Sequence, residues 1–142
     1  MPKNKATPVP VEDMNLENID FSLQTFGGFL RSVREARHIS LRDFEDKVLK
    51  TLAYLSDIER GKNKPPDKVL LDLMIKHLNV AQYPDIVSRL YDLAAVGRDA
   101  VPDDLKTWIM AETKHRELLR KCRDKKLTSA QVDGLLKIVE EM

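Results

Sequence analysis

The side chains best suited to specific chemistry in this 142-residue chain lie in one stretch, residues 54–66. An apolar helix end leads to Gly61, and a loop carrying Lys62, Asn63 and Lys64 follows before two prolines. Cationic and amide side chains on a loop bind phosphate oxygens through charge and hydrogen bonds. A helix that ends beside such a loop is what a nucleic-acid reader needs, so this stretch indicates binding to nucleic acid.

Other kinds of chemistry have little support in the sequence. It contains no glycine-rich phosphate loop and no serine or cysteine nucleophile beside a histidine in a known arrangement, and His38, His77 and His115 are widely spaced. Glu112, His115 and Cys122 could share one side of a helix, but a zinc site would need a fourth ligand. We therefore expect no enzymatic activity, no metal and no cofactor.

Two short helices must position the basic loop. Ser40, followed three residues later by a carboxylate, predicts one helix start, and Thr51 offers the cap of a second helix. Apolar residues recur at helical spacing in both, and Gly61 permits the backbone conformation that ends the second. Helices this short cannot bury their apolar faces alone, so segments 26–33 and 71–78 must supply further helices.

Residues 27–80 resemble, without a gap, the Cro and phage-repressor (XRE) type of helix-turn-helix domain, and residues 55–61 are the most specific part of the match. The resemblance implies an all-α, five-helix domain that binds double-stranded DNA through a recognition helix. It also pairs Arg34 of the first helix with Glu59 at the end of the recognition helix. We expect a partly buried, charge-assisted ion pair, and the alternative is two solvated charges.

The resemblance also implies which side chains contact DNA. Toward the bases it places Leu52, Ala53, Ser56 and Asp57. Toward the phosphates we assign Arg42, Lys50, Thr51, Arg60, Lys62, Asn63 and Lys64, with Thr51 also capping the recognition helix. Because the base-facing set has no Arg, Gln or Asn, direct readout would rest on thymine methyls, hydroxyl bonds and a carboxylate accepting from cytosine. Discrimination would then lean on DNA shape and on Arg42 or Lys50 at the groove edge.

Three residues depart from the family pattern. Glu45 stands where a small alanine is usual, Leu49 where the turn usually has glycine, and Lys50 where an apolar turn residue is usual. A positive φ at Leu49 would cost about 1 kcal/mol, so we expect the turn to avoid that conformation. Val48 or Leu49 would then fill the apolar niche while Lys50 points to solvent or to a phosphate.

The remaining chain shows helical spacing and no strand pattern, which predicts an all-α protein. One helix should end at Gly97, a second should start in residues 101–104, and a full capping box begins at Thr128. We divide the chain into a flexible N-terminal tail (1–22), the helix-turn-helix domain (23–82) and a helical C-terminal region for dimerisation or regulation (83–142).

The C-terminal region carries apolar residues that we assign to an intrachain core plus a homodimer surface: Leu105, Trp108, Leu118, Leu119, Val132, Leu135, Leu136 and Val139. The alternative is that all of them are internal core. A dimer would read two half-sites about one helical turn apart, which raises both affinity and specificity. The basic run 114–126 could touch flanking DNA, or it could be a solvated helix face.

Composition agrees with a cytoplasmic regulator. The formal net charge is only +1, but residues 27–80 carry 11 Lys/Arg against 8 Asp/Glu, so positive charge gathers in the DNA-binding part. Cys122 is the single cysteine and can form no disulfide within the chain. No segment is long and apolar enough to cross a membrane, and the start Met1–Lys5 lacks the apolar stretch of a secretory signal.

The resemblance thus implies a sequence-specific regulator of transcription, a homodimeric repressor acting on its own or a neighbouring promoter. One alternative is an antitoxin-type module that neutralises a partner protein and autoregulates its operon. Another is a protein-interaction module that does not bind DNA. Regulators of similar architecture are inactivated by a partner metallopeptidase that cuts the C-terminal extension, so a toxin or a peptidase is the protein partner to consider, the peptidase acting around residues 118–123.

Overall fold

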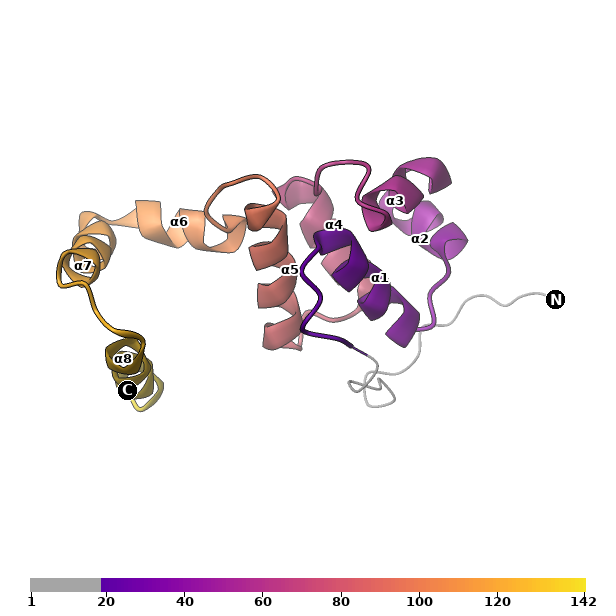
Figure 1. The fold of residues 1–142 in the computed structure, drawn as a ribbon. Helices are drawn as coiled ribbons and strands as arrows, with labels where there is room; N and C mark the ends of the chain where they lie inside the picture. Colours follow the sequence, from indigo (N-terminus) through magenta and orange to yellow (C-terminus); the bar gives the residue numbers. More distant parts are fainter. Residues whose placement is uncertain (1–18) are drawn as a thin grey trace. The chain divides into compact units, whose positions relative to one another are not determined.

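The computed structural model describes residues 19–142, and this part of the chain folds into α-helices joined by turns (Figure 1). The helices are α1 (Phe26–Ala36), α2 (Leu41–Val48), α3 (Leu52–Glu59), α4 (Lys68–Leu78), α5 (Pro84–Val96), α6 (Asp103–Ala111), α7 (Thr113–Asp124) and α8 (Ser129–Glu140). No strand occurs between residues 19 and 142, which confirms the prediction of an all-α fold.

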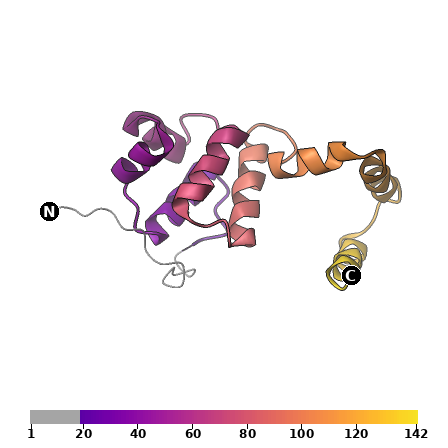
Figure 2. The same cartoon turned by 180° about the vertical axis from the view of Figure 1, so that it is seen from behind.

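The described part of the chain divides into two compact units, residues 19–104 and residues 105–142. In the first unit α1 contacts α3 and α5, while α2 contacts α3 and α4, an arrangement that can be followed from both sides in Figures 1 and 2. The domain boundary that we expected between residues 82 and 83 falls inside this unit, because α5 packs into the same core as the four helices before it.

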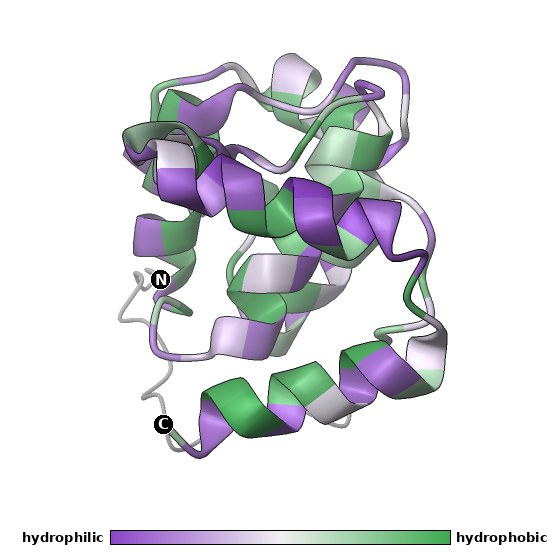
Figure 3. Cartoon of the chain, turned by 90° about the vertical axis from the view of Figure 1, so that its left-hand side faces the viewer, coloured by the Kyte–Doolittle hydropathy of each residue, from purple (hydrophilic) through white to green (hydrophobic). Residues whose placement is uncertain are grey.

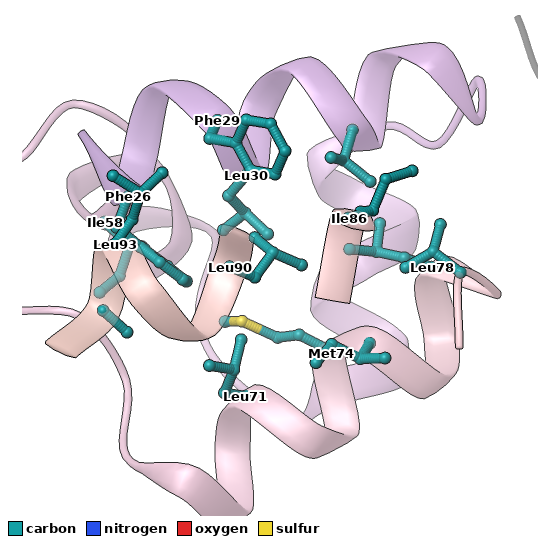
Figure 4. Close-up of a cluster of buried hydrophobic side chains, with 14 of the residues drawn as sticks. Phe26, Phe29, Leu30, Ile58, Leu71, Met74, Leu78, Ile86, Leu90 and Leu93 are labelled. Atoms are coloured by element: carbon teal, nitrogen blue, oxygen red, sulfur yellow. The ribbon is translucent and has the colours of Figure 1, made fainter. Parts of the chain in front are cut away.

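One hydrophobic core joins α1 to α5 (Figure 4). Phe29 of α1, Met74 of α4 and Leu90 of α5 are fully buried, and Leu55 and Ile58 of α3 are each 1% exposed. These helices have only 8 to 13 residues, too few to be stable alone in water. Burial of their shared apolar faces therefore stabilises the fold.

Helix α1 and the end of α3 approach each other closely at Gly27. A Cβ atom at this position would lie 2.2 Å from the carbonyl oxygen of Ile58 and 2.6 Å from that of Glu59. Both neighbours are backbone atoms that cannot move aside independently, so only glycine allows the contact. The end of α3 is thereby held directly against the first turn of α1.

The helix ends predicted from the sequence are present. The hydroxyl of Ser40 accepts the N–H of Asp43 at 3.1 Å, and Thr128 begins a full capping box. At the end of α3, Gly61 has φ +78° and the N–H of Lys62 donates to the carbonyl of Asp57 at 2.8 Å. This is the glycine-terminated helix end expected there, and it starts the basic loop at a fixed point.

The turn between α2 and α3 differs from expectation at Leu49. This residue has φ 58° and ψ 38°, the left-handed conformation that we expected the turn to avoid, and its side chain is 83% exposed. Val48, only 2% exposed, fills the apolar niche instead. Burying Val48 and Leu55 on either side of so short a turn contributes more than the strain of about 1 kcal/mol costs.

The tail predicted for residues 1–22 lies mostly outside the described residues. Its last part packs on the first unit, where Ile19 is 5% exposed and the Phe21 ring lies 5.5 Å from the Phe29 ring between centroids. Residues 19–22 are therefore part of the folded unit.

The second unit has a different character, because α6, α7 and α8 contain no buried residue. Hydrophobic residues occur all along α8, the helix that ends at the C label in Figure 3. The eight apolar residues that we assigned to an intrachain core plus a dimer surface are 41% to 63% exposed. These residues are therefore not covered within the second unit itself, and both the dimer surface and the internal core stay predictions.

Candidate nucleic-acid interface

Helix α3 buries one face and presents the other. Leu55 and Ile58 point into the core, whereas Leu52 is 37% exposed, Ala53 is exposed and Ser56 is half-buried. These three belong to the set that the resemblance turns toward the bases. The helix therefore offers a short, mainly apolar surface with one hydroxyl, suited to contact with methyl groups and single hydrogen-bonding atoms.

The end of α3 is fixed by Arg34 and Glu59, the two residues that the resemblance pairs. Arg34 Nε lies 2.7 Å from Glu59 Oε2, and Arg34 Nη2 lies 3.0 Å from Glu59 Oε1. Arg34 Nη1 also donates to the carbonyl of Ile39 at 2.6 Å. The side chains are 9% and 5% exposed, so the charges are in contact and largely removed from water. This two-bond geometry orients α3 against α1 more strictly than a single bond could.

Arg37 is a second buried arginine, which was not predicted from the sequence. Its side chain is fully buried, and Nε donates to the carbonyl of Leu78 at the end of α4 at 3.1 Å. Burial lowers the pKa of Arg37 and nearby Tyr83 raises it, but arginine stays protonated at any relevant pH. Arg37 follows Leu30 and Val33 at helical spacing, and this spacing could have indicated that Arg37 lies on the core face of α1.

The start of α3 carries two side-chain caps. Thr51 Oγ1 accepts the N–H of Tyr54 at 3.1 Å, as predicted from its position. Glu45 Oε2 accepts the N–H of Leu52 at 2.9 Å, a contact that we did not foresee. Glu45 stands where the family usually has alanine, and here its longer side chain reaches from α2 to satisfy one of the free N–H groups of α3.

Two of the predicted DNA contacts are engaged with each other. Arg60 Nη2 lies 2.9 Å from Asp57 Oδ1, with the side chains 56% and 35% exposed. Asp57 was assigned to a base and Arg60 to a phosphate. In the free protein this pair partly neutralises both, and either assignment requires the pair to open or to share its donors and acceptors with DNA.

The other predicted phosphate ligands are exposed residues in the segments around α3. Lys62, Asn63 and Lys64 are exposed on the loop after Gly61, and Arg42 is exposed in the first turn of α2. Lys50 Nζ lies 5.5 Å from the centre of the Tyr54 ring, a cation–π contact that adds Tyr54 to this surface. Tyr54 is half-buried on α3 and was not among the predicted DNA contacts.

The structure brings together no metal site within residues 19–142. Of the three residues weighed as zinc ligands, His115 Nε2 lies 3.3 Å from Glu112 Oε2, and the His115 ring stacks on Trp108 at 3.8 Å between centroids.

None of the helices in this part of the chain is both long and apolar enough to cross a bilayer.

Comparison with known proteins agrees with this geometry. Residues 30–80 match a family model described as helix-turn-helix. Two similar proteins from Mycobacterium tuberculosis, strains CDC 1551 / Oshkosh and ATCC 25618 / H37Rv, are named uncharacterized HTH-type transcriptional regulators. Each is 43% identical over 44 residues, which are 31% of this chain and 31% of the relative. The match thus spans about a third of the length of either relative, and no solved structure matches the chain.

Proposed function

We propose, from the premise that residues 30–80 form a helix-turn-helix domain of the Cro and phage-repressor type, that this chain regulates transcription by binding double-stranded DNA. In this function α3 enters the major groove. The exposed side chains of Leu52 and Ala53 and the half-buried side chain of Ser56 face the bases, and the loop after Gly61 contacts phosphates.

The observation that carries the proposal is the anchoring of α3. The Arg34–Glu59 pair fixes its last turn, and Glu45 and Thr51 cap its first. Its outer face is accessible and lies next to the exposed cations of the following loop. A recognition helix must be held rigidly while its outer face stays accessible. The contacts at both ends of α3 hold the helix, and its outer face is left uncovered.

We further propose that the regulator is a cytoplasmic homodimer that represses its own or a neighbouring promoter. The support for a dimer is the second unit, whose apolar residues stay exposed in the single chain. Side chains such as Leu135 and Leu136 gain free energy when a second copy covers them. The same exposed residues also favour a regulatory protein partner, so a toxin or a peptidase remains the second candidate for this surface.

Footprinting on the DNA upstream of the gene tests the proposal. Protection of two half-sites about one helical turn apart would support a dimeric reader, and their position relative to the promoter would distinguish repression from activation. Absence of protection, together with no binding to any duplex, would contradict the proposal and favour a module that binds only protein.

The basic loop supplies a second test. If Arg60, Lys62 and Lys64 of each protomer neutralise phosphates, the logarithm of affinity should fall with the logarithm of salt concentration with a slope on the order of −4 to −6. The double variant Lys62→Ala/Lys64→Ala should weaken binding to every sequence by a similar factor and flatten this slope. An unchanged slope would show that the loop does not lie on the DNA.

A further inference from the structure

The turn that follows α5 lies against the basic loop that follows α3. A Cβ atom at Gly97 would lie 2.9 Å from Cγ and 3.2 Å from Cδ of Pro65, so only glycine fits this approach without a shift. The next residue, Arg98, donates a hydrogen bond from Nη2 to the carbonyl of Pro65. A residue 33 positions later in the chain thus contacts the loop that carries Lys62, Asn63 and Lys64.

The backbone around Arg98 has a defined conformation. Its own N–H donates to the carbonyl of Ala95 at 3.0 Å, and the N–H of Ala100 donates to the same carbonyl at 3.0 Å. Asp99, between them, has φ 52°, which closes the helix end in the left-handed conformation. Arg98 is therefore presented to the basic loop from a hydrogen-bonded turn, although it lies outside the residues that match the helix-turn-helix family.

Arg98 lines an open cavity of about 380 Å³ together with residues from the turn before α3, from α3 itself and from the basic loop. The polar groups in its wall are Lys50, Tyr54, Asn63, Lys64, Asp67 and Arg98. Asp67 uses Oδ1 to cap α4, accepting the N–H of Leu70 at 2.9 Å. Three cations against this one capping carboxylate give the cavity an excess of positive charge.

We propose that this cavity binds one phosphate of the DNA backbone and that Arg98 is a phosphate ligand beside Lys50 and Lys64. The inference rests on the proposed function, since Tyr54 of α3 and Asn63 of the basic loop, two residues of the proposed DNA surface, line the cavity. Arginine has five N–H donors, and the Pro65 carbonyl accepts from one of them. The contact to Pro65 thus orients the guanidinium while other donors serve the phosphate.

Salt-dependent binding of the full-length chain to a labelled duplex of arbitrary sequence tests this assignment, because binding that depends on phosphates needs no known operator. Arg98→Ala should weaken binding and reduce the magnitude of the log–log slope by about 0.9 per bound protomer. Arg98→Lys, which keeps the charge, should retain most of the slope. Lys64→Ala is a second variant in the same cavity and should reduce the slope by a similar amount.

Arg31→Ala is the matched control. Arg31 is an exposed arginine of the same unit, paired with Glu35 on α1 at 3.0 Å, so its loss changes net charge equally without touching the cavity. Its slope should equal that of the wild type. If Arg98→Ala lowers affinity but leaves the slope unchanged, Arg98 only holds the loop through Pro65, and the assignment to phosphate is wrong.

Two further outcomes separate this inference from the proposed function. Wild-type binding with a normal slope, combined with wild-type behaviour of Arg98→Ala, overturns the phosphate assignment and leaves DNA binding intact. If the wild type binds no duplex, both ideas fail. Titration of the DNA-free chain with inorganic phosphate, followed by NMR, should show no saturation at this cavity. Saturation below about 1 mM, combined with an unchanged salt slope for Arg98→Ala, would instead assign the cavity to a free anion and overturn the DNA contact.

Discussion

At the scale of single residues, Arg34 makes the contacts on which the orientation of α3 most depends. Its guanidinium holds both oxygens of Glu59 and the carbonyl of Ile39, so it links α3 to α1 and to the loop after α1. The side chains are largely removed from water. Removing one partner leaves the other charge buried without its counterpart, which is costlier than losing an exposed pair.

We therefore expect Arg34→Ala and Glu59→Ala each to lower the free energy of unfolding by about 3–5 kcal/mol. Arg34→Lys should recover only part of this, because an ammonium group cannot reproduce the planar fork. Urea unfolding of both single variants and the double variant checks the pair. In this cycle, additive effects would mean that the contact contributes no coupling energy.

Leu49 shows where reasoning from the sequence failed at this scale. The spacing of caps and apolar residues predicted a short turn between α2 and α3, but it could not say whether burial of Val48 or relief of strain would win. The structure favours burial and leaves Leu49 at φ 58° with its side chain 83% exposed. Strain at one exposed residue is a small term, and single-sequence reasoning cannot rank it against packing that is not yet known.

Leu49→Gly should therefore stabilise the protein. Glycine adopts the left-handed conformation without the clash of a Cβ, and little buried surface is lost with this side chain, so we expect a gain of about 1 kcal/mol. For a domain of this size that corresponds to a rise of roughly 4–8 °C in Tm, measurable by circular dichroism. Leu49→Ala, which keeps the Cβ, is the control and should give no comparable rise.

At the scale of helices, the sequence predicted where helices begin and end better than it predicted the contacts between them. Ser40, Thr51, Gly61 and Thr128 act as predicted because capping depends on a few neighbouring residues. The break between α6 and α7 at Glu112 was not predicted. There the His115 side chain reaches the carbonyl of Trp108 at 2.5 Å, and such a contact has no signature in the spacing of apolar residues.

The hydrogen bond from the Leu52 N–H to Glu45, which joins α2 to α3, is one of the contacts between helices that the sequence did not predict. Glu45→Ala removes the acceptor of the Leu52 N–H and should destabilise the protein by about 1 kcal/mol, the usual cost of a lost helix cap. Glu45→Gln keeps an acceptor and removes a negative charge beside the end of α3 that we propose faces DNA. We expect it to be nearly as stable as the wild type and to bind duplex DNA more tightly at low salt.

Thermal melts and fluorescence anisotropy at two salt concentrations measure the two effects separately. Tighter DNA binding by Glu45→Gln should shrink as salt rises, since it comes from charge alone. If Glu45→Gln binds DNA more weakly at every salt concentration, the carboxylate helps to place α3 in the groove, and its charge is not a handicap.

At the scale of the whole chain, the apolar pattern predicted helices throughout but not which of them share a core. The spacing of Ile86, Leu90 and Leu93 resembles that of Val132, Leu135 and Leu136, yet only the first group is buried in the single chain. Apolar residues at helical spacing indicate that one face of a helix must be buried. The spacing does not indicate whether the surface that buries this face belongs to the same chain or to another molecule.

If a second copy covers the C-terminal unit, truncation after Pro102 should leave residues 19–102 folded, because their core is complete, but monomeric. The full chain should sediment as a dimer and lose this state in the variant Leu135→Lys/Val139→Lys, whose positions are 43% and 63% exposed. Gly134→Lys is the control, since its position opens on empty space and lies about 100° from Leu135 and about 140° from Val139 around the helix axis of α8.

Sedimentation velocity at several protein concentrations measures the outcome, and DNA binding provides a second readout. The monomeric forms should bind paired half-sites at least about 100-fold more weakly than the dimer, because two linked readers no longer act together. A truncated protein that is still dimeric would move the two-fold contact into the first unit. A full chain that is monomeric at all concentrations would instead leave its exposed apolar residues for a different protein, as the toxin or peptidase alternative requires.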